Sequence, residues 1–407
     1  MPEAPVAASL SWPESLFDGA SNLTQGCVDD FDPTVDYFPE KANFRHTEQL
    51  EVEYHGHYKQ VTFRPSSDPE HIQRYFLVQC GTPEPVDAAG AVVVSVPVRH
   101  FIATAASWPG VIDALGLVDQ LAGLGTTRRL TTASIQERVE RGEVTETGRF
   151  HHTDVEKILD LEAGLVVDTF SSYDDYEFKH LLEAVGAPVV LDGKHLEATP
   201  LATSEWIQWL ALFFNRERDA EVLFQGIEER YQQLAQQVGT VENRPVVMTD
   251  WFDKDAWNVF GSANASARHI VDAGGAYFWE EDTPLNWFEV PLTLAFERAA
   301  EADHWVWVPS TLRNMDDVLS QEQRLASLPV VRNGELYGFD LGAPEADRAP
   351  FYDQLLTAPD VVLADMISIF HPDVLPDHEP VFFRRLEPGE AREVSSLSPR
   401  LRKKGES

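Results

Sequence analysis

Aromatic side chains and arginines recur just after the short apolar runs of this sequence. Tryptophan and tyrosine offer a large contact area and lose little conformational entropy on binding. Arginine stays charged and pairs in a bidentate way with carboxylate or phosphate-like oxygens. This combination indicates a site for a large, partly flat and partly anionic ligand, unless the tryptophans only pack the core. The candidate ligand-binding residues are Arg99, Ser107, Trp108, Arg128, Arg129, Tyr173, Trp251, Trp257, Asn286, Arg313 and Arg348.

The histidines allow a second interpretation, in which the protein binds a bare metal ion through imidazole and carboxylate groups. The candidates are His55, His57, His100, His151, His152, His269 and His371. The first two fall in an expected hairpin turn, and residues 151 and 152 precede an expected surface helix. Only His100 falls in a loop after an expected strand. The placement of the histidines therefore argues against a site in which protein side chains alone bind a bare metal ion.

Motifs that would indicate catalysis are absent from the sequence. It has no Gly-x-Ser-x-Gly elbow, no His-Glu-x-x-His helix and no phosphate-binding glycine loop. The acidic pairs Asp174-Asp175 and Glu280-Glu281 are unremarkable among 67 acidic residues. We therefore expect a binding protein and not an enzyme, with no resident cofactor.

Two similar series of strands and helices must position the candidate residues. The first begins with the apolar run 91–96 and continues through a polar loop to a helix ending near Gly116. The second begins with residues 245–249 and continues through an aromatic loop to a helix over 262–273. Strands that alternate with helices predict parallel sheets covered on both faces. In such sheets ligands bind beyond the carboxyl ends of the strands, which is where the candidates are expected.

The two series continue in the same order. A helix over 155–161 and a strand over 163–167 match residues 292–300 and 302–306; a helix over 176–186 and a strand over 188–191 match residues 323–328 and 329–331. This internal repetition predicts two lobes of similar construction.

One long helix is predicted between the two series. Apolar residues recur at spacings of three and four from Trp206 to Val238, the period of one buried helical face. The polar run 215–219 marks the expected position of a kink. The predicted fold class is α/β: two Rossmann-like lobes with mainly parallel sheets, joined by one long helix, with the ligand cleft between the lobes. The alternative is a single doubly wound domain with a long surface helix.

These patterns also divide the chain. We expect an irregular N-terminal extension over 1–45, an N-terminal lobe over 46–200, the linker helix over 201–238, a C-terminal lobe over 239–390 and a disordered tail over 391–407. A hairpin over 50–63 and a strand over 74–79 should precede the first series. A helix over 359–370 and a strand at 381–383 should close the second.

The bulk composition excludes some partners. With 407 residues the chain is long enough for about two domains. A formal net charge of −35 repels nucleic acid and anionic membranes. No stretch approaches the roughly 20 apolar residues of a membrane span, and residues 1–26 lack the apolar segment of a signal peptide.

The two cysteines, Cys27 and Cys80, leave the redox compartment open. A disulfide between them would tie the N-terminal segment to the first lobe and indicate an oxidising compartment outside the cytosol. Two unpaired core cysteines are the alternative.

The order of several stretches resembles the periplasmic substrate-binding proteins of ABC importers for iron complexes and vitamin B12. The stretches are 92–97 as an opening strand, 115–123, 155–167, 270–275 and 359–365, with His371-Pro372 at the end of the last helix. The similarity covers residues 45–390. Members of this family have two Rossmann-like lobes bridged by a single helix, in agreement with the predicted fold class.

The resemblance implies a periplasmic or extracellular monomer that captures an iron chelate, such as a ferric siderophore, with cobalamin as the second choice. It would deliver this ligand to an ABC permease and ATPase complex. In the family, one glutamate on each lobe docks onto the permease, and Glu156 and Glu289 match those positions. The resemblance also favours a Cys27–Cys80 disulfide. The alternative from another class is a cytoplasmic enzyme or metallocofactor protein on a similar scaffold, for which two distant cysteines do not supply the cluster ligands.

Overall fold

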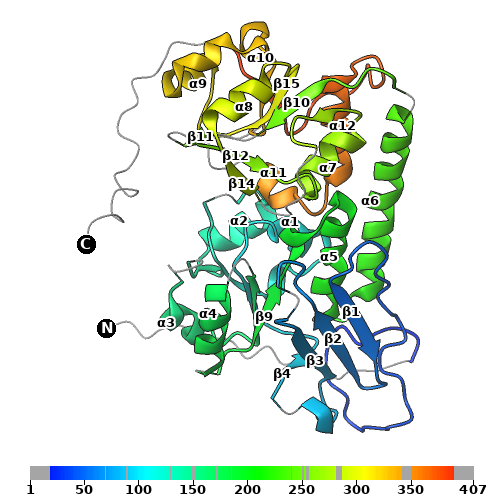
Figure 1. Ribbon diagram of the computed structural model, residues 1–407. Helices are drawn as coiled ribbons and strands as arrows, with labels where there is room; N and C mark the ends of the chain where they lie inside the picture. Colours follow the sequence, from blue (N-terminus) through cyan, green and yellow to red (C-terminus); the bar gives the residue numbers. More distant parts are fainter. Residues whose placement is uncertain are drawn as a thin grey trace.

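The computed structural model describes residues 19–388, apart from residues 69, 89, 129, 149–152, 171–172, 185, 240, 250–251, 254–255, 281–286 and 342–349. In this part of the chain two α/β lobes lie one above the other (Figure 1), each built on a mainly parallel sheet. The predicted fold class is confirmed. The N-terminal residues 1–18 and the expected tail over 391–407 lie outside the described residues.

The N-terminal lobe is built on a five-stranded parallel sheet in the order β7-β6-β5-β8-β9. Its strands are β5 (Phe101–Ala103), β6 (Leu121–Leu124), β7 (Thr145–Glu146), β8 (Leu165–Thr169) and β9 (Val189–Asp192). Its helices are α1 (Pro109–Ala114), α2 (Ala133–Glu140), α3 (Val155–Asp160) and α4 (Tyr173–Ala184). Strand β5 and the first three residues of β8 are apolar and buried because helices cover both faces of the sheet.

A separate four-stranded sheet precedes this one, in the order β1-β2-β3-β4. It contains the expected hairpin, β1 (Leu50–Tyr54) and β2 (Tyr58–Phe63), and the expected strand β3 (Gln73–Gln79). It also contains β4 (Val92–Val96), which pairs in parallel with β3. The prediction that residues 91–96 open the first series is therefore wrong, because β5 has that place. A strand of three residues gives too short a pattern to be recognised in the sequence.

The C-terminal lobe has a second parallel sheet, in the order β13-β10-β15-β16-β17, in which only β17 is antiparallel. Its strands are β10 (Val246–Thr249), β13 (Ala276–Tyr277), β15 (His304–Val308), β16 (Leu336–Gly338) and β17 (Arg384–Arg385). A small antiparallel sheet, β11 (Phe252–Asp253), β12 (Ala256–Phe260) and β14 (Trp287–Pro291), lies where we expected only loops. The helices are α7 (Ala265–Asp272), α8 (Leu292–Ala299), α9 (Met315–Gln321), α10 (Pro329–Asn333), α11 (Pro350–Gln354) and α12 (Pro359–Phe370).

Two expected strands of this lobe are wrong. Residues 329–331 begin α10, because Pro329 occupies the first helical turn, where its fixed φ suits a helix. The helix stops at Gly334, which adopts a left-handed φ of 71°. Residues 381–383 form no strand either. Their three backbone amides all donate to the buried carboxylate of Asp365 in α12.

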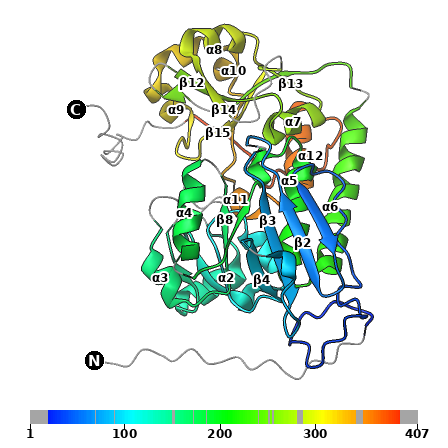
Figure 2. The same cartoon turned by 60° about the horizontal axis from the view of Figure 1, so that its bottom comes forward.

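The long helix predicted over 201–238 is two helices, α5 (Pro200–Leu212) and α6 (Glu217–Val238). The chain reverses at residues 213–216, where Asn215 has a φ of 55°. Figures 1 and 2 show α5 beside α6, and α6 alone running along the side of the molecule from one lobe to the other. The apolar period continues through the reversal because α5 is buried on nearly all sides and α6 buries one face.

Residues 19–49 contain no helix or strand and are held to the N-terminal lobe by specific contacts. Cys27 and Cys80 form the disulfide that the family resemblance favoured. The buried carboxylate of Glu205 in α5 accepts hydrogen bonds from the backbone amides of residues 45, 46 and 47 at 2.6–2.8 Å. These bonds replace a strand ladder in satisfying the backbone of an irregular segment.

Candidate functional site

An aromatic cavity of about 500 Å³ lies at the carboxyl end of β15. Its wall includes Trp305 and Trp307 of β15, Phe260 at the end of β12 and Phe339 after β16. The remaining lining residues are Ser266, Pro309, Ser310, Thr311, Leu312, Gln321, Phe351, Tyr352 and Leu355. A concave, mostly apolar space with a few hydroxyl and amide groups is typical of a small-molecule site.

The backbone at Trp307 is strained. Trp307 has a φ of 55°, and the pairing of β15 with β16 is irregular between Trp305 and Val308. A left-handed conformation costs roughly 1–2 kcal/mol for a residue with a side chain and is uncommon for a bulky one. Here it places the indole edge-to-face with Phe260, at 5.9 Å between ring centroids. Strain of this kind is concentrated at functional sites, which supports the assignment of the cavity.

Helix α11 connects this cavity to the N-terminal lobe. Phe351 and Tyr352 line the cavity and pack against Phe339, at 5.2 and 5.5 Å between ring centroids. The next residue, Asp353, accepts hydrogen bonds from Thr131 and Thr132, just before α2. Because α2 follows the carboxyl end of β6, the carboxyl edges of both parallel sheets meet at α11. The cavity therefore lies near the junction of the lobes, although all its lining residues belong to the C-terminal half of the chain and not to both lobes, as the predicted cleft would require.

A buried polar cluster lies at the carboxyl edge of the N-terminal sheet, and no pattern in the sequence predicted it. Asp192 at the end of β9 accepts hydrogen bonds from the Trp108 indole at 3.0 Å and from Lys194 at 2.6 Å. Burial lowers the pKa of Lys194, and the charge of Asp192 opposes this shift. Next to it, Thr104 donates to Asp168 of β8. The cluster holds Trp108 rigidly beneath the strand ends.

Trp108 and Trp257, two of the predicted ligand-binding residues, are buried and already engaged. Trp108 is fully buried and stacks on Trp209 of α5. Trp257 donates its indole N–H to the carbonyl of Thr249, and its ring lies 5.3 Å from that of Trp305. Trp257 thus supports the cavity wall from behind, and neither indole presents a free surface.

The arginines are placed in three different ways. Arg99 follows the carboxyl end of β4, as expected, but β4 belongs to the separate sheet, so Arg99 lies at the amino edge of the parallel sheet, before β5. Arg128 is exposed after the carboxyl end of β6, as expected. Arg313 follows the cavity residue Leu312, and its guanidinium pairs with buried Asp340 at 3.0 Å.

The other predicted residues are only partly described. Ser107 is half-buried between β5 and α1, and Tyr173 begins α4. Arg129, Trp251, Asn286 and Arg348 lie outside the described residues. The role of the whole set in ligand binding stays a prediction. The sequence analysis missed five aromatic residues of the cavity wall: Trp305, Trp307, Phe339, Phe351 and Tyr352. The rule of strand ends could have identified only the first two, because they lie on β15, whose carboxyl end borders the cavity.

The described histidines form no group that could hold a metal ion. His269 is buried against the carbonyl of Pro359, and burial lowers the pKa of its imidazole to about 4. His371 lies 3.2 Å from the carbonyl of Gly274. Among the described residues, which leave out His151 and His152, no group of three or more histidine, cysteine or acidic side chains is arranged to hold a metal ion.

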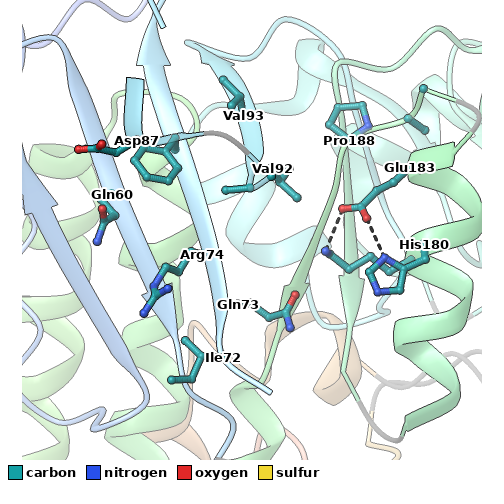
Figure 3. A pocket seen from close by; sticks show the side chains of 16 residues that line it. Gln60, Ile72, Gln73, Arg74, Asp87, Val92, Val93, His180, Glu183 and Pro188 are labelled. Atoms are coloured by element: carbon teal, nitrogen blue, oxygen red, sulfur yellow. Dashed lines mark hydrogen bonds and ion pairs between the residues drawn. The ribbon is translucent and has the colours of Figure 1, made fainter. Parts of the chain in front are cut away.

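A second depression, of about 1030 Å³, lies on the N-terminal lobe (Figure 3). Residues 72–74, 90–93 and 186–188 line it, and these precede or begin β3, β4 and β9. It therefore opens at the amino ends of strands, the edge opposite to the usual ligand side. Glu183 pairs with Lys179 at 2.8 Å and with His180 at 3.2 Å, and Figure 3 shows Glu183 and His180 at the border of the depression. None of the predicted ligand-binding residues lines it.

The two predicted docking glutamates are both exposed. Glu156 lies in the first turn of α3, and Glu289 lies on β14, three residues before α8. Each thus comes just before or within the helix that leads into a core strand of its own lobe. None of the described helices is both long and apolar enough to cross a membrane.

The family model for periplasmic binding proteins matches residues 102–341, which is 240 of the 407 residues. The chain belongs to this family. It is a solute-binding protein of the type that serves ABC importers, and its family consists of binding proteins, not enzymes. The match begins within β5, in agreement with β5 as the opening strand.

Individual relatives are distant. An uncharacterized lipoprotein of Methanocaldococcus jannaschii is 21% identical over 300 residues, covering 72% of this chain and 69% of the relative. The structure of Helicobacter pylori CeuE in complex with nickel and histidine matches with a TM-score of 0.57 and 13% identity, over 78% of this chain and 90% of CeuE. HutB, a periplasmic heme binding protein of Vibrio cholerae, matches with a TM-score of 0.52 and 17% identity, over 67% of this chain and 99% of HutB. At these identities the solved structures show the shared fold alone.

Proposed function

We propose that this protein is an extracytoplasmic receptor that captures a metal chelate with flat, apolar rings, an iron siderophore in the first place, and delivers it to an ABC permease and its ATPase. The observation that carries the proposal is the aromatic cavity at the junction of the lobes. Its rings suit a flat ligand, and its serine and threonine hydroxyls suit the polar atoms of a chelator. Structural relatives are described as binding iron, nickel or heme, which supports a metal as part of the ligand.

The location rests on two observations. The Cys27–Cys80 disulfide is of the kind that persists in oxidising compartments. The relative from Methanocaldococcus jannaschii is named a lipoprotein. Both support a place outside the cytoplasm, where such a receptor must meet its ligand.

The test is to titrate the protein with hemin, a ferric catecholate and cyanocobalamin and to measure binding by the quenching of tryptophan fluorescence. Trp307→Ala should weaken the chelate that binds by about tenfold or more, because one ring of the cavity wall is lost. Trp279→Phe is the matched control, because Trp279 is buried beneath Arg298 and does not line the cavity. Equal losses in both variants would contradict the assigned cavity.

The anionic side of the ligand is tested at the arginines after β6. Replacing Arg128 and Arg129 together by alanine should weaken an anionic ferric siderophore at least tenfold, about 1.4 kcal/mol. The reason is that an exposed cation in a protein of net charge −35 is a preferred place for an anion. Cyanocobalamin lacks comparable carboxylates and should lose less. An equal loss for both ligands would show that the arginines only hold the loop.

A further inference from the structure

Helix α11 belongs to the C-terminal half of the chain but contacts the N-terminal lobe. It leads into α12, which packs against α6 and α7, and Figure 1 shows α11 between the lobes beside α1 and α2. Two of its residues, Phe351 and Tyr352, form part of the cavity wall. One short helix therefore contacts both the proposed ligand site and the opposite lobe.

The contact with α2 depends on one carboxylate oxygen. Asp353 Oδ2 accepts hydrogen bonds from the amide of Thr132 at 2.7 Å and from the hydroxyls of Thr131 and Thr132 at 2.9 and 3.0 Å. The amide of Thr131 is a fourth donor. Since the amides before and within the first turn of a helix lack intrahelical partners, the carboxylate both satisfies them and suits the dipole of α2.

The other oxygen of Asp353 has no such support. Oδ1 is buried and has no hydrogen-bond partner among the described residues, which leave out residues 342–349 just before α11, and Asp353 as a whole is 1% exposed. Burial raises the pKa of Asp353, whereas the bonds from the two threonines lower it. Leaving a buried acceptor unsatisfied costs free energy, so the bonds of Oδ2 stabilise the contact while the unpaired Oδ1 destabilises it. Such a contact can be released more easily than a fully satisfied one.

A second contact fixes the distance between α11 and α1. A methyl group at Gly110, in the first turn of α1, would come within 2.4 Å of the backbone oxygen of Asp353. The backbones of the two helices therefore touch with no room for a side chain. This observation is independent of the carboxylate, because it involves main-chain atoms only.

We propose that α11 is a latch between the lobes. The Asp353 carboxylate and the close packing of the α11 backbone against Gly110 hold α11 to the N-terminal lobe, while Phe351 and Tyr352 contact the ligand. A ligand that moves these rings moves the same helix that sets the spacing of the lobes. The coupling to ligand rests on the proposed function; the latch itself does not.

The experiment measures the distance between spin labels on the two lobes without any ligand. Both cysteines of the sequence are in the disulfide, so labels can be attached at His180→Cys in α4 and Glu301→Cys after α8, two exposed positions. Asp353→Ala should shift the distance distribution to longer values and broaden it. Gly110→Ala, a change in the N-terminal lobe, should also lengthen and broaden the distances, because its methyl group pushes α11 away while Asp353 keeps its side chain. Gly164→Ala is the control, because its methyl group meets only the carbonyl of His100, at an ordinary 3.6 Å.

Two outcomes decide the proposal. A longer distance in Asp353→Ala and Gly110→Ala, with the control unchanged, supports the latch. The wild-type distance in a folded Gly110→Ala protein overturns it, even if Asp353→Ala fails to fold. Because no ligand is added, that result would leave the receptor assignment standing, whereas failure of every chelate to bind would contradict the receptor and leave the latch.

Discussion

Replacing Lys59 by methionine tests what holds the reversal between α5 and α6. Lys59 Nζ is fully buried and donates to the carbonyl of Leu212 at 2.6 Å, to Asn215 Oδ1 at 2.8 Å and to the carboxylate of Glu217. The ammonium thus binds the last turn of α5, the left-handed residue of the turn and the first residue of α6. Burial lowers the pKa of Lys59, and the charge of Glu217 raises it.

The magnitude follows from what the substitution leaves behind. Without Lys59, the Glu217 carboxylate stays fully buried and has no cation beside it; Asn22 Nδ2, at 2.8 Å, and the Tyr54 hydroxyl remain as neutral side-chain donors in the described part of the chain. Breaking a buried ion pair by removing one partner typically costs about 3–5 kcal/mol, because the other charge is left uncompensated. The carbonyl of Leu212 also loses its donor. Replacing both partners, Lys59→Met with Glu217→Met, should recover most of this loss, since an apolar pair of similar volume is often neutral.

The assay is urea denaturation of wild type, both single variants and the double variant, followed by tryptophan fluorescence. The free energies of unfolding form a double-mutant cycle, whose coupling term isolates the pair. We expect strong coupling between the two positions. A loss below about 1 kcal/mol in Lys59→Met, or additive single losses, would refute the reasoning, because either would mean that Glu217 is not left as a buried, unpaired charge.

Three further predictions concern other parts of the chain. The pKa of histidine is near 6.5 in the unfolded chain, and burial lowers the pKa of His269 to about 4 in the folded protein. As the pH falls between these two values the unfolded chain binds the proton first, so the folded protein loses up to about 3 kcal/mol of stability. The melting temperature should therefore fall less between pH 7 and pH 4.5 in His269→Gln than in wild type, and parallel curves would contradict this. Trp307→Gly should be about 1 kcal/mol more stable than Trp307→Ala, because glycine adopts a left-handed φ freely; a more stable alanine variant would argue against the strain. Glu156→Ala combined with Glu289→Ala should leave chelate affinity unchanged and abolish permease-stimulated ATP hydrolysis; surviving stimulation would reduce both residues to helix-start acids, which contribute only a few tenths of a kcal/mol through the helix dipole.

The sequence predicted the two-lobed α/β architecture because hydrophobic runs and helical periods are local signals. It failed where a long-range contact decides the local structure. The apolar run 92–96 suits either sheet, and only its pairing with β3 places it outside the parallel one. The polar run 215–219 marked the place where the long helix is interrupted. The apolar period through residues 206–238 could not show that the chain reverses there, because the reversal depends on buried Lys59, more than 150 residues away.

The candidate cavity matches the sequence analysis in its place on a sheet more than in its residues. The rule of strand ends pointed to the carboxyl edges of both parallel sheets, and the cavity lies at that edge of the C-terminal sheet. The tryptophans chosen from composition, Trp108 and Trp257, are buried behind the surface that a ligand would touch. Helix α11 was not predicted at all, because five residues give no periodicity and its contact with residues 131–132 spans more than 220 positions.

The measurement that tests the central claim most directly is the identity of the ligand carried by the protein from its own host. The protein should be purified without denaturation from iron-starved cells, and its absorption spectrum, metal content and intact mass under native conditions recorded. We predict a bound metal chelate. It should give an absorption band at wavelengths longer than those of the protein's own absorption, and an added mass that is lost when the metal is removed. A bound sugar, amino acid or peptide without metal would contradict the account, as would a protein that stays colourless when offered hemin, a ferric catecholate and cyanocobalamin.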